Sequence, residues 1–231
     1  MPVALIQPDT TVRYIKLGEK GRWESSCIAE GTIRLGYESP YHQNSLARDW
    51  EPVGAHWLKV RNGNKREATK DIKEIQAFYE LSENSLWITF HKRKLFWSFA
   101  DAQVIKLEDG SRIRRTVDGW SCKDLNGNDL TIETLDGRVS KVQGYRRTIC
   151  EIELPEYVIR KVNGLPQPEV KSAQESVETL RGSIEDLMQG LWWKDFELLV
   201  DLLFSQSGCQ RLSVLGQTDK DRSRCVLAGD K

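Results

Sequence analysis

Apolar and polar residues in the N-terminal part of the chain follow two different periods. Residues 66–80 place apolar side chains at the i, i+3, i+6 and i+7 spacing of one helix face, which predicts an amphipathic helix. Residues 86–99 (LWITFHKRKLFWSF) contain two apolar runs around a basic turn, which predicts a β-hairpin. The other apolar runs are short and end at glycines or Asp-Gly pairs, which is typical of strands joined by tight turns. This part is therefore predicted to be a β-rich curled sheet or small barrel with one or two helices.

The C-terminal part has helical periodicity instead. Residues 175–190 carry apolar side chains at helical spacing, and a second apolar stripe follows over residues 191–205. Between the two parts, residues 162–176 (VNGLPQPEVKSAQES) contain two prolines and many polar residues, as linkers do. We therefore expect an α+β protein with a β-rich domain over residues 1–161, a linker over 162–176 and a helical module over 177–231.

Composition narrows the class of protein. The chain has 231 residues, and a hydrophobic content of 39% with eight tryptophans is enough for a packed core. Its five cysteines are widely spaced without a CxxC pair, which argues against a disulfide framework or a zinc cluster and favours a reducing compartment. No apolar run is long enough to cross a membrane, and the N-terminus lacks the features of a signal peptide. A cytoplasmic protein without a membrane partner is expected.

Basic and aromatic residues of the N-terminal part form a candidate nucleic-acid surface. A basic hairpin tip can contact phosphates, and nearby tryptophans can stack on bases. The alternative is that aromatic residues in strands lie in the core and that basic residues are solvated. The predicted nucleic-acid-binding residues are Trp23, Trp87, His91, Lys92, Arg93, Lys94, Arg114 and Arg115.

The C-terminal segment DFELLVDLLFSQSGCQRLSVLGQTDKD resembles the opening of Mrr-type restriction endonuclease domains of the PD-(D/E)xK superfamily. Phe196-Glu197 match the pair on the first helix of that family, Gly208 matches the helix end, and Lys220-Asp221 match the turn of its catalytic hairpin. The resemblance implies that Glu197 and Asp221 are catalytic carboxylates and that Asp221 is a metal ligand. In the intact family enzyme, carboxylates of this kind hold Mg²⁺, which activates water against a phosphate.

Two departures from the family pattern affect the expected activity. Ser223 occupies the position of a second hairpin aspartate, and the later strand with a Gln/Glu-x-Lys pair is not found in the sequence. We therefore expect an incomplete endonuclease-like module, with no cofactor acting in this chain and no cleavage of DNA by it.

The N-terminal part is loosely similar to the PUA-like modified-base readers that include the EVE and YTH domains, which hold a flipped-out base in an aromatic cage. Together, the two resemblances predict a DNA-binding protein of restriction or defence type that binds duplex DNA and reads a modified base. The alternative from another class is a protein–protein interaction module, in which the C-terminal helices form a homodimer without binding nucleic acid.

Overall fold

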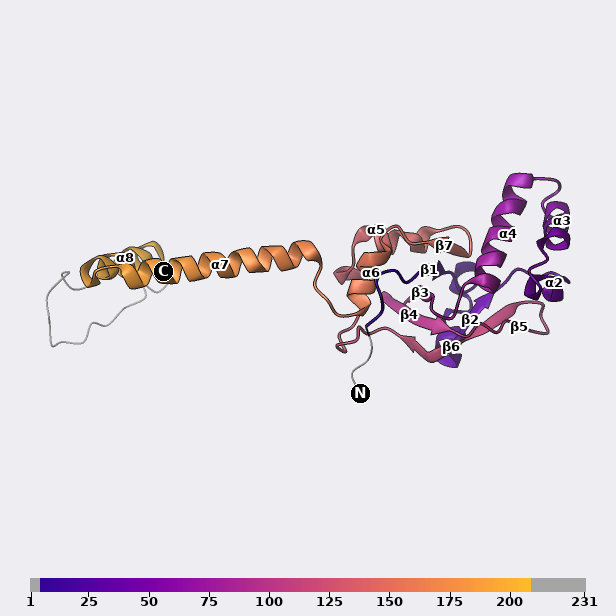
Figure 1. Cartoon of the computed structure of the whole chain (residues 1–231), viewed down its shortest axis with the longest axis horizontal. Coiled ribbons are helices and arrows are strands. Elements are labelled where there is room, and N and C mark those ends of the chain that lie inside the picture. Colours follow the sequence, from indigo (N-terminus) through magenta and orange to yellow (C-terminus); the bar gives the residue numbers. More distant parts are fainter. Residues whose placement is uncertain (1–4, 209–231) are drawn as a thin grey trace, which may run out of the picture. The chain divides into compact units, whose positions relative to one another are not determined.

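The computed structural model describes residues 5–208, which divide into two compact units that meet between Gln167 and Pro168. Unit 1 is a curled mixed sheet with helices, and unit 2 consists of helices (Figure 1). The predicted fold class, α+β with a curled N-terminal sheet, is confirmed.

The sheet of unit 1 runs in the order β2-β6-β4-β3-β1-β7, and β5 pairs with β6. Only the β1–β3 pairing is parallel among the described strands; the other pairs are antiparallel. The strands are β1 (Val12–Ile15), β2 (Thr32–Leu35), β3 (Leu86–His91), β4 (Lys94–Ala100), β5 (Ile105–Lys106), β6 (Arg112–Ser121) and β7 (Ile149–Glu151).

The predicted hairpin over residues 86–99 is confirmed as β3 and β4. His91 pairs with Lys94, so the turn is only Lys92 and Arg93, both with positive φ (45° and 61°). Two-residue hairpin turns of this handedness match the twist of the strands, and they occur here without the usual glycine. β3 is buried from Leu86 to Phe90, which makes it the central strand.

The described part of unit 1 contains six α-helices, where the sequence predicted one or two. The predicted helix over residues 66–80 is confirmed as α4, but α1, α2 and α5 span seven residues or fewer and are too short to show a helical period. The helices are α1 (Glu24–Glu30), α2 (His42–Leu46), α3 (Trp50–Val60), α4 (Lys65–Glu80), α5 (Gly137–Ser140) and α6 (Pro155–Val162).

Two apolar clusters form the core, one against each face of the sheet. On β3, Trp87 belongs to the cluster that includes residues of α3 and α4, whereas Leu86 and Ile88 belong to the cluster that includes residues of α5 and α6. This division follows the alternation of side chains along a strand. A strand with apolar residues on both faces reads as one continuous apolar run, as β3 does in the sequence.

Unit 2 contains α7 (Pro168–Gly190) and α8 (Trp193–Gln206). Both helices predicted for the C-terminal part are confirmed. Residues 168–176, which fall in the expected linker, form the first turns of α7, and Pro168 stands at its first position, where proline fits a helix. No helix within residues 5–208 has the length and apolar character needed to span a membrane.

Candidate functional site

The cations of the predicted hairpin surface are mostly paired with carboxylates. Arg93 donates to Glu133 from Nε at 2.9 Å, and Lys94 donates from Nζ to Asp129 at 2.8 Å. Lys92 is exposed at the tip and has no ion pair within the described residues. The β3–β4 tip therefore offers phosphates less free charge than the sequence HKRK indicates.

Two of the predicted nucleic-acid residues lie in the core. Trp87 and Arg114 are both 0% exposed. Arg114 donates to the carbonyls of Asp101, Phe78, Leu81 and Ala100, and burial lowers its pKa to about 10. Its guanidinium thus joins backbone segments inside the fold and has no exposed surface for a ligand.

His91 forms a hydrogen-bonded chain with two residues at the start of α1. Its Nδ1 lies 3.0 Å from Glu24 Oε2, and its Nε2 lies 3.4 Å from Ser25 Oγ. A serine–histidine–carboxylate order is also that of hydrolytic triads, but the serine distance exceeds the usual reach of about 3.2 Å. Ser25 lines neither of the two large hollows of unit 1. We interpret these hydrogen bonds as a structural link between α1 and the β3–β4 hairpin.

A cleft of about 670 Å³ brings Trp23 together with basic residues from three segments of unit 1. Its size is that of a typical ligand pocket. We call it the basic cleft, because six of the described residues that line it are basic and three are acidic. The lining residues are Lys16, Gly18, Glu19, Lys20, Arg22, Trp23, Gly36, Tyr37, Arg61, Glu67, Asp71, Arg146, Arg147 and Thr148.

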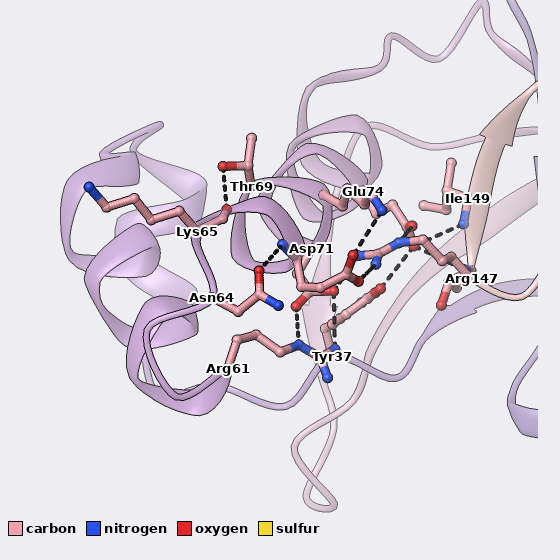
Figure 2. Close-up of polar contacts among 12 residues, drawn as sticks. Tyr37, Arg61, Asn64, Lys65, Thr69, Asp71, Glu74, Arg147 and Ile149 are labelled. Atoms are coloured by element: carbon pink, nitrogen blue, oxygen red, sulfur yellow. Dashed lines mark hydrogen bonds and ion pairs between the residues drawn. The ribbon is translucent and has the colours of Figure 1, made fainter.

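Three carboxylates on one face of α4 form the acidic cluster, Glu67, Asp71 and Glu74, of which Glu67 and Asp71 line the basic cleft. Their i, i+4 and i+7 spacing places like charges side by side, which destabilises a helix unless cations compensate. Arg147 provides that compensation by donating to all three, at 2.8 Å to Glu67 and 2.6 Å to Glu74, with Asp71 as the third partner (Figure 2). Arg61 adds a second cation, with Nε 2.5 Å from Asp71 Oδ2.

Each carboxylate of the acidic cluster accepts more than one hydrogen bond. Glu74 Oε2 accepts from the Tyr37 hydroxyl at 2.9 Å and from the backbone N–H groups of Thr148 and Ile149 (Figure 2). Burial alone would lower the pKa of Arg147, but its hydrogen bond to Glu74 and the nearby negative charges raise that pKa overall. Burial and the charge of Glu74 raise the pKa of Tyr37. Arg147 therefore stays charged and holds the segment before β7 against α4.

The rim of the basic cleft carries the cations that remain available. Lys20, Arg22 and Arg146 are exposed, and none of them has an ion pair or side-chain hydrogen bond within residues 5–208. Lys16, in contrast, donates from Nζ to the carbonyl of Tyr145. The rim thus presents three cations and one exposed carboxylate, Glu19, beside an acidic cluster that is paired with Arg61, Lys70 and Arg147.

Trp23 forms one wall of the basic cleft and orders two arginines. The guanidinium carbons of Arg22 and Arg34 lie 4.3 and 4.2 Å from its ring, within cation–π range. A side chain at Gly36 would come within 3.0 Å of the ring, so glycine is needed for this close approach. Guanidinium groups thus lie against the indole, and bases can stack on both kinds of group.

The remaining predicted site residues lie elsewhere. Arg115 is exposed and lines a separate hollow of about 720 Å³ between α1 and β6, together with Glu30. Glu197 lies on α8, and Asp221 lies outside the described residues. Within the described residues, no group of three or more His, Cys, Asp or Glu side chains could hold a metal ion.

The acidic cluster and the cations Lys20, Arg22, Arg61, Arg146 and Arg147 were not predicted from the sequence to form one site. One sequence feature could have indicated this site. Three carboxylates lie at i, i+4 and i+7 on an amphipathic helix, and such a row of like charges needs basic partners. The chain matches no protein-family model, no curated protein and no solved structure.

Proposed function

We propose that unit 1 binds DNA through the basic cleft. The observation that carries this proposal is the set of three exposed, unpaired cations, Lys20, Arg22 and Arg146, beside the stacked surface of Trp23. Phosphates are bound by such cations, and a planar surface next to them accepts a base. The cation–π contact holds the Arg22 guanidinium against the indole, where it can stack on a base or contact a phosphate.

The cleft replaces the hairpin as the proposed contact surface. Arg93 and Lys94 would have to give up Glu133 and Asp129 before binding a phosphate, whereas the rim cations give up nothing but water. Trp87 and Arg114 are buried and have no place in the proposed interface. The volume of the cleft also leaves room for a flipped-out, modified base, which is the more specific form of the proposal.

The resemblance of the C-terminal segment to Mrr-type endonucleases supports a role in restriction or defence, in the cytoplasm, as the wider proposal. Under it, unit 1 recognises DNA and this chain does not cleave it. Whether the chain cleaves DNA is tested by incubating the purified protein with Mg²⁺ or Mn²⁺ and with modified and unmodified plasmid. Intact plasmid is expected, and nicked or linear products would contradict it.

Binding itself is tested with fluorescently labelled duplex and single-stranded oligonucleotides over a series of salt concentrations. If three cations replace counterions on duplex DNA, the plot of log affinity against log salt has a slope of about −2.7. A comparison of duplexes with and without a modified base tests the base-reading form. No binding at low salt, or binding that does not depend on salt, would contradict the proposal.

A further inference from the structure

Helix α7 has an apolar stripe along its length. The stripe consists of Val170, Ala173, Val177, Leu180, Ile184 and Leu187, which are separated alternately by three and four residues. None of the described residues of α7 is buried, and Leu187 is 72% exposed. A helix in water draws most of its stability from packing of its apolar face, so a face of this kind calls for a partner.

The alternation of three and four residues is the heptad repeat of a coiled coil, with Val170, Val177 and Ile184 at position a. Position d holds Ala173, Leu180 and Leu187. β-Branched residues at a combined with leucine at d favour two parallel strands over three or four. The identity of the stripe residues, and not only their spacing, therefore specifies the kind of partner.

The positions that flank the stripe fit a second copy of the same helix. Between residues 174 and 190, Arg181 is the only charged residue at positions e and g, and it is bonded to Glu185 of its own helix at 3.1 Å. Two identical helices would thus meet without facing like charges. Charges at e and g select a different partner chain in many coiled coils, and α7 has only Arg181 and, in its first turn, Glu169 at these positions. Its other charged residues lie on the outer positions b, c and f.

We propose that α7 forms a parallel, two-stranded coiled coil with α7 of a second copy of this chain. The assembly then carries two basic clefts. Simultaneous binding at both raises the apparent affinity for a long DNA, provided that the geometry permits it. The coiled coil rests on unit 2 alone, and its test needs no nucleic acid, so it stands or fails independently of the proposed function.

Sedimentation equilibrium of the full chain over a wide concentration range tests this proposal. The wild-type protein is expected to sediment as a dimer that dissociates on dilution. Leu187→Lys should raise the dissociation constant at least about a hundredfold, because each dimer loses two buried leucine side chains. The matched control is Gln189→Lys, which places the same side chain at the outer position f and should leave the constant unchanged.

A gain-of-function variant keeps the test decisive if Leu187→Lys disturbs folding. Ala173→Leu fills position d and should lower the dissociation constant at least about tenfold. The parallel orientation is tested by oxidation of Val177→Cys, whose two copies face each other only in a parallel, in-register pair. Glu175→Cys is the control, because it keeps the native cysteines and places the new one at the outer position f. It should not crosslink above the wild-type level.

A wild-type chain that stays monomeric at all concentrations would overturn the proposal. So would equal effects of Leu187→Lys and Gln189→Lys, a trimeric or tetrameric mass, or crosslinking through Glu175→Cys but not Val177→Cys. A parallel, two-stranded coiled coil requires a dimeric mass, altered dissociation constants for the variants at position d, and a crosslink through Val177→Cys.

Discussion

At the scale of single residues, arginines of unit 1 perform two different tasks. Arg114 is buried and donates to four backbone carbonyls, whereas Arg147 is bonded to three carboxylates of α4. In both cases the charge is used inside the fold. A sequence shows that a residue is basic. Whether its charge is free to bind a ligand depends on hydrogen-bond partners that here lie 13 to 80 positions away along the chain. This is why the site could be predicted only in part, with Trp23 as the shared residue.

Asp71 should be the most sensitive carboxylate of the acidic cluster. It is fully buried and bonded to both Arg61 and Arg147. Asp71→Ala removes the ion-pair partner of Arg61 and one of the three carboxylates bonded to Arg147, and it should lower the free energy of unfolding by about 1.5–3 kcal/mol. Urea unfolding followed by circular dichroism measures this loss.

Glu67→Gln is the matched control within the same cluster. The Glu67 side chain is 38% exposed, so its ion pairs are screened by water and the variant should unfold close to the wild type. Equal losses for the two variants would show that burial does not set the strength of this network.

At the scale of elements, long periodic segments were predictable and short ones were not. α4 and the β3–β4 hairpin follow from their apolar periods, as do the helices of unit 2. α1 and α2 do not, because a helix of one or two turns leaves no repeated pattern. The apolar content of β3 predicted a strand, but which helices cover its two faces depends on contacts between distant segments. The curled sheet was predictable as a class, and its strand order was not.

The start of α4 offers a test of how local structure supports the basic cleft. Asn64 caps this helix, and its side chain accepts from the backbone N–H of Glu67 at 3.2 Å. Asn64→Ala removes the cap and should cost about 1 kcal/mol of the free energy of unfolding. Asn64→Asp keeps an acceptor at the same place and should unfold close to the wild type. Indistinguishable unfolding of wild type and Asn64→Ala would mean that the cap adds nothing to the stability of α4.

At the scale of the whole molecule, the chain combines a unit with its own core and a unit of exposed helices. Every buried residue of the two apolar clusters lies between Ile6 and Val162, and unit 2 contributes none of the residues described there. The account assigns recognition of DNA to unit 1 and pairing of chains to unit 2.

The self-contained core predicts that residues 1–167 fold alone. This fragment should unfold in urea at the same midpoint as the corresponding transition of the full chain. A fragment of residues 1–150 is the control, because it lacks the core residues Val158, Ile159 and Val162 of α6 and should lose cooperative unfolding. A markedly lower midpoint for residues 1–167 would show that unit 2 stabilises unit 1.

The claim that the basic cleft binds DNA is tested most directly by two triple variants with the same loss of charge. Lys20→Ala/Arg22→Ala/Arg146→Ala removes the free cations of the cleft rim, and Lys92→Ala/Arg93→Ala/Arg115→Ala removes the same residue types from the hairpin tip and β6. Affinity for a labelled duplex is measured for both over a salt series. The cleft variant should lose most of its affinity and its salt dependence, while the second keeps both. If the Lys92/Arg93/Arg115 variant lost binding while the cleft variant kept it, the claim that the basic cleft binds DNA would be contradicted.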